Sequence, residues 1–135
     1  MSATSFRVKI AGIRTTTFDS IEGLSGRIEL IEYSDGDDLL TRKRPGRVSF
    51  GDITLKRGEL GADAFYRWWY AARSGKLQRR DVSVSFIDSN RRTLLQWQFQ
   101  AWPLAWEISA SNARGRGMIA LESCTLAVES VELIL

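Results

Sequence analysis

Two blocks of opposite charge in the middle of the chain are the residues with the most distinctive chemistry. Leu39 and Leu40 separate these blocks, so apolar side chains lie between the acidic and the basic groups. Ion pairs can orient two surfaces, and leucine burial can hold them together. The pattern therefore favours protein–protein contact over catalysis. The acidic block is Asp35, Asp37 and Asp38, and the basic block is Arg42, Lys43, Arg44 and Arg47.

Residues suited to catalysis or metal binding are scarce. The chain has no histidine and one cysteine, Cys124, which excludes histidine-based triads, zinc sites built on histidine, and disulfides within the chain. With no histidine to activate it, Cys124 is predicted to be a small core residue. The acidic block lacks the glutamate that ends a calcium-binding loop. We therefore predict a protein that is not an enzyme and has no cofactor and no metal.

Nucleic-acid binding is an alternative interpretation of the basic and aromatic residues. Arg114 and Arg116 form an Arg-Gly-Arg-Gly sequence, and the basic block could contact phosphates. However, the formal net charge is only +3, and the adjacent acidic block would offset the attraction. The tryptophans fall on one helix and at alternating strand positions, which favours core or subunit contact. A monomeric oligonucleotide-binding barrel is thus kept as the less favoured hypothesis.

Length and composition indicate one globular domain over residues 1–135. Hydrophobic residues make up 44% of the chain and charged residues 26%, which is close to the average for globular domains. No segment approaches the ~18 apolar residues of a membrane-spanning helix. The N-terminal residues also lack the apolar region of a signal peptide. We expect assembly in the cytoplasm, without membrane insertion.

Most of the chain alternates between apolar and polar residues, as antiparallel strands do. The alternation is strict in Val82–Phe86 and Leu95–Phe99, with a turn at Asp88–Arg92 between them. The pattern predicts a mainly β protein, an antiparallel barrel or sandwich of six to eight strands with one helix and a long extended loop. The other expected strands are Phe6–Ile10, Ile13–Phe18, Arg27–Tyr33, Val48–Leu55 with a bulge at Gly51, Trp106–Ile108 after an interruption at Trp102-Pro103, and Met118–Leu135 with a break near Ser130.

One helix is expected at about residues 61–74. Gly75 follows it at the position of a C-terminal cap, with Asp63 in the first turn and Arg73 in the last. An apolar face at helical spacing is expected to pack over the open side of the barrel. That face is Phe65, Trp68, Trp69 and Ala72.

The charge blocks fall in an expected loop from Ser34 to Gly46, with Arg47 directly after it. Loops of this length in a compact domain are usually functional. We predict that the segment Asp35–Arg47 contacts an identical neighbouring chain. The alternative is a mobile surface loop with solvated charges. The apolar segment Val131–Leu135 is also explained if a neighbouring copy covers it.

Several motifs, taken in order, resemble the tail tube proteins of contractile phages and phage-derived injection systems. The resemblance covers nearly the whole chain and departs from the family at Val131-Glu132-Leu133. The motifs that carry it are Ile31-Glu32-Tyr33-x-x-Gly36, Arg44-Pro45-Gly46, Ile53-Thr54-Leu55-Lys56-Arg57-Gly58, Trp68-Trp69, Gln78-Arg79-Arg80, Trp97-x-Phe99-x-Ala101-Trp102-Pro103 and Ala120-Leu121-Glu122.

This resemblance implies a structural protein whose subunits form hexameric rings. The rings stack into a hollow tube inside a contractile sheath, and strands of all subunits join into one barrel around the lumen. The charged and leucine-bearing segment Asp35–Arg47 would then be the ring-stacking interface. Implied partners are the sheath protein, the baseplate or spike hub, the tail terminator, and a DNA or effector cargo. A tube–baseplate or tube-terminal adaptor of the same fold is the alternative.

Overall fold

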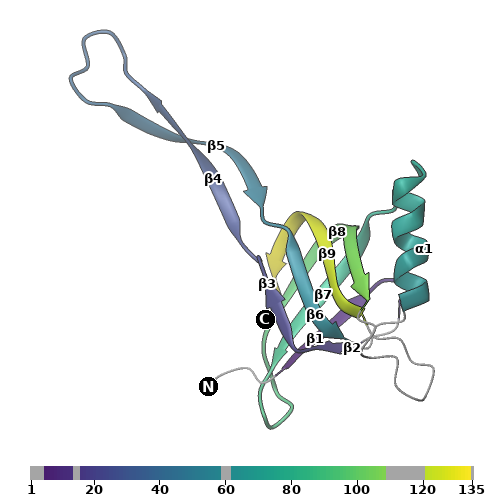
Figure 1. Ribbon diagram of the computed structural model, residues 1–135. Coiled ribbons are helices and arrows are strands. Elements are labelled where there is room, and N and C mark those ends of the chain that lie inside the picture. The colour runs from purple at the N-terminus through teal and green to yellow at the C-terminus, as the bar shows by residue number, and fades with distance from the viewer. Residues whose placement is uncertain (1–4, 14–15, 59–61, 109–120, 135) are drawn as a thin grey trace.

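A computed structural model describes residues 5–13, 16–58, 62–108 and 121–134. Within these ranges the chain forms nine strands and one helix (Figure 1). The elements are β1 (Ser5–Ile10), β2 (Thr16–Phe18), β3 (Ser20–Glu22), β4 (Gly26–Tyr33), β5 (Arg42–Phe50), β6 (Ile53–Gly58), α1 (Ala62–Arg73), β7 (Arg80–Ile87), β8 (Thr93–Ile108) and β9 (Leu121–Leu133).

Seven strands form one antiparallel sheet in the order β2-β1-β7-β8-β9-β6-β3. The sheet curls until β2 lies against β6 and β1 approaches β3, so the barrel is nearly closed (Figure 1). The predicted mainly β fold is confirmed, and the strand number of the barrel lies within the predicted range. The two remaining strands, β4 and β5, form a separate ribbon.

The interior of the barrel is filled by the apolar members of each alternating strand. Val8 of β1, Val84 of β7 and Leu55 of β6 have no exposed surface. Phe99 and Leu126 complete the same cluster from β8 and β9. Full burial of one such side chain contributes roughly 1.5–3 kcal/mol, so the core holds the strands in register.

Helix α1 begins and ends close to the predicted boundaries. Gly75 adopts a left-handed φ of 83°, which only glycine adopts without strain. Its N–H donates to the carbonyl of Ala72 (3.2 Å), and the N–H of Lys76 donates to that of Ala71 (2.8 Å). These bonds satisfy carbonyls that the helix end would otherwise leave free, so the predicted cap is confirmed.

The β4–β5 ribbon projects away from the barrel like an arm (Figure 1). The predicted loop from Ser34 to Gly46 is therefore wrong beyond residue 41, because β5 already begins at Arg42. Pro45 lies inside this strand, opposite Leu30. A two-stranded ribbon tolerates a proline since each strand has one free edge, where a missing N–H breaks no ladder.

Two further predicted strand interruptions, one at a glycine and one at a proline, are wrong. Gly51 is not a bulge, because it joins β5 to β6 and these strands belong to different sheets. Trp102-Pro103 does not interrupt β8, which runs unbroken through a register shift between Pro103 and Ala105. The expected break near Ser130 is also wrong, because β9 runs unbroken from Leu121 to Leu133. A register shift lies there instead, since Ser130 pairs with Gln100 while Val128 pairs with Ala101.

Some predictions fall on residues that the structure does not describe. Of the strand expected at Ile13–Phe18, the described strand is Thr16–Phe18, and residues 14–15 lie outside the described ranges. Arg114 and Arg116 lie outside them as well.

Candidate assembly interfaces

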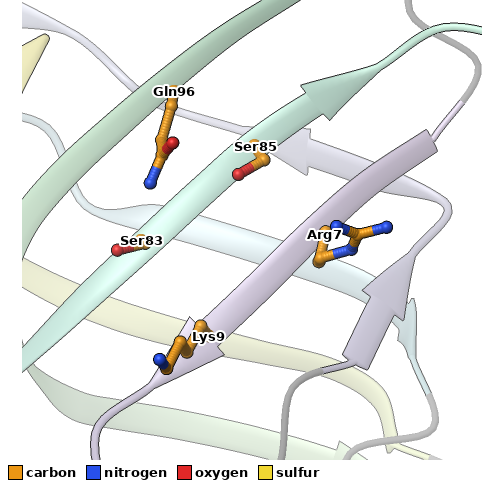
Figure 2. A pocket seen from close by; sticks show the side chains of 5 residues that line it. All are labelled: Arg7, Lys9, Ser83, Ser85 and Gln96. Atoms are coloured by element: carbon orange, nitrogen blue, oxygen red, sulfur yellow. The ribbon is translucent and has the colours of Figure 1, made fainter. Parts of the chain in front are cut away.

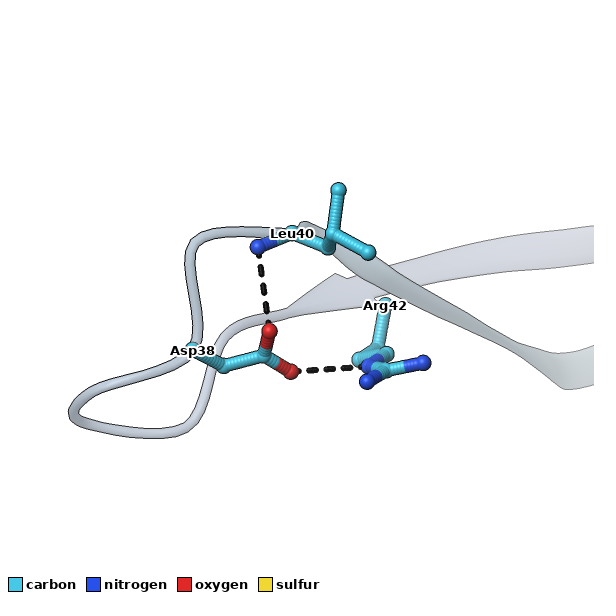
Figure 3. Close-up of polar contacts among 3 residues, drawn as sticks. All are labelled: Asp38, Leu40 and Arg42. Carbon is cyan, nitrogen blue, oxygen red and sulfur yellow. Dashed lines mark hydrogen bonds and ion pairs between the residues drawn. The ribbon is translucent and has the colours of Figure 1, made fainter.

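Asp38 organises the turn at the tip of the ribbon (Figure 3). Its Oδ1 accepts a hydrogen bond from the backbone N–H of Leu40 (3.0 Å), and its Oδ2 accepts one from Nε of Arg42 (2.8 Å). The hydrogen bond from Arg42 holds the pKa of Asp38 below its ordinary value. The carboxylate therefore stays ionised and fixes the turn at neutral pH, and this fixation is lost as the pH falls through the lowered pKa.

This turn presents two leucines to solvent. Leu39 is fully exposed and Leu40 is 64% exposed. The ribbon behind them also carries exposed apolar residues, Ile28, Leu30 and Val48. Several exposed apolar residues on a projecting arm are typical of a contact with another chain.

The predicted charge blocks occupy different parts of the arm. Asp35 and Asp37 lie in the exposed turn and form no ion pair with the described residues. The basic block follows strand β5, where Arg44 lies over the ring of Tyr33 (5.9 Å). The structure thus separates an acidic tip from a basic shaft. The basic residues on β5 are Arg42, Lys43, Arg44 and Arg47.

The outer face of the barrel sheet is polar across four strands. In one row Lys9 pairs with Ser83, Ser83 with Gln98, and Gln98 with Glu132. Alternation places the apolar neighbours of these residues inside the barrel, so only polar side chains remain outside. The row crosses the four adjacent strands β1, β7, β8 and β9.

A second row runs beside the first, from Arg7 through Ser85 to Gln96. The two rows border a shallow hollow of about 470 Å³ on this face (Figure 2). The alternation in the sequence indicates that the strands have one apolar and one polar face, but not which strands lie side by side on the polar face.

The β9 margin of this polar face has a free edge. β6 pairs with β9 only as far as Leu126, so the later residues of β9 are paired with β8 alone among the described strands. Glu129 lies at the bulge and accepts a hydrogen bond from Arg79 (2.6 Å). This bond lowers the pKa of the Glu129 carboxyl. A free edge is a template for pairing with another chain.

The aromatic residues of α1 pack against the barrel. Phe65 and Trp68 are buried, Trp69 and Ala72 are half-buried. Trp69 donates from Nε1 to the carbonyl of Leu104 on β8 (2.9 Å) and meets the edge of Trp106. These side chains therefore connect the helix to the sheet.

Cys124 is fully buried in the barrel core. Burial raises the pKa of its thiol to about 12, so the unreactive protonated form persists at neutral pH. We expect a water-soluble thiol reagent at pH 8 to label the folded protein very slowly and the urea-unfolded protein rapidly. Labelling at equal rates would contradict the assigned burial.

The described residues contain neither a metal-binding cluster nor a membrane-spanning helix. Over the described ranges, no group of three or more histidine, cysteine, aspartate or glutamate side chains is arranged to hold a metal ion. No helix in the same ranges has the length and apolarity to cross a membrane.

The model of the T4-like virus tail tube protein gp19 family matches residues 2–132. The chain belongs to this tail tube family. The resemblance seen in the sequence motifs is thereby confirmed. No match was found among the curated proteins.

Solved structures share the tail tube fold. One is a chain of the sheath–tube complex of an extracellular contractile injection system, PVC, in the extended state, with 24% identity and a TM-score of 0.75, covering 97% of this chain and 88% of that one. A chain of the PVC sheath/tube terminator has 24% identity and a TM-score of 0.76, covering 100% and 96%. A chain of the tube-terminating cap of the anti-feeding prophage, AFP, has 26% identity and a TM-score of 0.74, covering 97% and 88%.

Proposed function

We propose that this tail tube protein forms hexameric rings that stack into the inner tube of a contractile injection system or phage tail. The observation that carries the proposal is the projecting arm with its exposed leucines, Leu39 and Leu40, in a chain of this family. An arm of this kind buries its apolar tip only against another chain. The role is structural, so the chain acts by assembling and not by catalysing a reaction.

In this proposal the polar sheet face lines the lumen. Serine and glutamine predominate on it, as at Ser83, Ser85, Gln96 and Gln98, and these side chains hydrogen-bond with water. A hydrated wall without large apolar side chains gives a passing cargo no adhesive surface. The lumen would then conduct DNA or an effector protein.

The edges of the same face provide the contact between neighbours in one ring. Lys9 and Glu132 occupy the two ends of one cross-strand row. Joining the free edge of β9 to the end of β1 beyond Val8, which β2 leaves unpaired, would place opposite charges of neighbouring copies side by side. Such a head-to-tail contact generates a closed ring if the rotation closes.

A second role within the same fold is a tube-terminal or tube–baseplate adaptor. The similarity to chains of a terminator and of a cap favours this candidate, because their TM-scores are close to that of the sheath–tube chain. In either role the partners would be further copies of this chain, the sheath protein, the baseplate hub and the tail terminator. An adaptor would form rings that do not stack with one another.

Light scattering coupled to size-exclusion chromatography tests the proposed assembly. We expect the purified chain at low salt to elute as particles of six chains or as larger multiples. A lone oligonucleotide-binding barrel would elute as a monomer. A monomer at every concentration tested would contradict the proposed ring.

A further inference from the structure

An apolar groove lies at the base of the arm. It has a volume of about 610 Å³ and is lined from one side by Ile21, Leu24 and Phe50 and from the other by Leu95 and Trp97. Leu95 is 39% exposed. The barrel thus offers an apolar recess near the point where the arm is attached.

The arm cannot fill the groove of its own chain. Gly26 and Phe50 line the groove and pair with each other at the first position of the ribbon. Leu39 lies at the opposite end, and Figure 1 shows the ribbon extended away from the barrel. Strand β4 has 8 residues, which at ~3.3 Å per residue places the tip about 26 Å from the base.

Charge next to the groove complements the charge of the tip. Arg91 and Arg92 lie exposed in the turn between β7 and β8, three to four residues before Leu95, which lines the groove. Neither arginine forms a side-chain ion pair with the described residues. The acidic residues of the tip would meet this basic border if the leucines entered the groove.

We propose that the groove receives the Leu39–Leu40 tip of a second copy of this chain. The contact is heterologous, because tip and groove are different surfaces of one molecule, and it therefore repeats from copy to copy. Two copies joined in this way are displaced from each other by about the length of the arm. This inference rests on the proposed tube and assigns the surface on which each ring receives the arms of the next ring.

Site-directed disulfides test the contact directly. A chain with both Leu39→Cys and Leu95→Cys should give a ladder of covalent multimers on a non-reducing gel after mild oxidation. Each single variant should stop at dimers, because each chain then has one reactive thiol. The native Cys124 is buried and does not interfere.

The matched control combines Leu39→Cys with Leu104→Cys. Leu104 is a leucine of β8 with 37% exposure, close to that of Leu95, but it lies at the helix side of the barrel. We expect this control chain to form no ladder under the same oxidation. Equal ladders from both double variants would show that the disulfides form by random encounter of exposed thiols and not by a specific tip–groove contact. This result would overturn the inference.

The possible results separate this inference from the proposed function. No ladder in samples whose micrographs show tubes would overturn the groove assignment and leave the tube in place. In such tubes, a thiol reagent then shows whether the groove is covered. If it does not label the Leu95→Cys variant, another segment covers the groove, and if it does, the groove stays open. No ladder and a monomeric chain would overturn both proposals, whereas a ladder without rings would support the contact alone.

Discussion

Replacing both Leu39 and Leu40 with serine is expected to leave the fold and the rings intact and to abolish long tubes. The two side chains are exposed in the single chain, so their loss removes nothing from the core. On stacking, each fully buried leucine would contribute roughly 1.5–3 kcal/mol. These contributions are repeated around every ring, so the double variant should lose nearly all stacking. Tube length in electron micrographs measures the effect.

The matched control for this experiment is Leu77→Ser together with Leu104→Ser. Leu77 and Leu104 are each 37% exposed, and both lie away from the arm. The control should therefore form tubes of normal length. If the Leu39 and Leu40 double variant also forms tubes of wild-type length, the tip is not the stacking element.

The substitution Trp68→Ala is expected to destabilise the fold by about 3–5 kcal/mol, as truncation of a buried aromatic residue does. Trp68 is 1% exposed and meets the edge of Phe65. Its Nε1 donates to the carbonyl of Gln78 (2.7 Å), and Arg80 lies over its ring (5.0 Å). The loss is a large fraction of the 5–15 kcal/mol that holds a typical domain together. Urea denaturation followed by circular dichroism measures it.

Tyr70→Ala provides the comparison on the same helix. Tyr70 is 48% exposed, and its truncation should change the free energy of unfolding far less. A midpoint for Trp68→Ala equal to that of wild type would mean that the helix does not close the barrel through this residue.

The helix and the barrel strands were predictable because local sequence determines them. Phe65, Trp68 and Trp69 fall on one helical face. The alternation of apolar and polar residues in β7 and β8 indicates a sheet with one apolar side. The two prolines were interpreted less well. Pro45 and Pro103 both lie within strands, since a ribbon edge and a register shift remove the need for their N–H groups.

Strand β4 matches the predicted strand Arg27–Tyr33, but the first half of β5, from Arg42, was expected to belong to the charged loop. The first half of β5 is exposed on both faces, so its sequence lacks the apolar–polar alternation that indicates a half-buried strand. The groove could not be predicted either. Its walls come from residues as distant in sequence as Ile21 and Val131, and only the tertiary fold brings them together.

The polar sheet face was predictable only in part. Ser83, Ser85, Gln96 and Gln98 are the outward members of the same alternation that located Val84 and Phe99 in the core. The pairing of Lys9 with Ser83 and of Gln98 with Glu132 depends on strand order. That order is not encoded locally, and it decides which charges lie at the two margins.

Negative-stain electron microscopy of the purified wild-type chain tests the central claim most directly. The proposed function predicts rings with six-fold symmetry and a central hole, together with tubes formed by their stacking. Rings that never stack would favour the adaptor role over the main tube subunit. Fields of single particles without rings or tubes, at concentrations where the protein is folded by circular dichroism, would contradict the account.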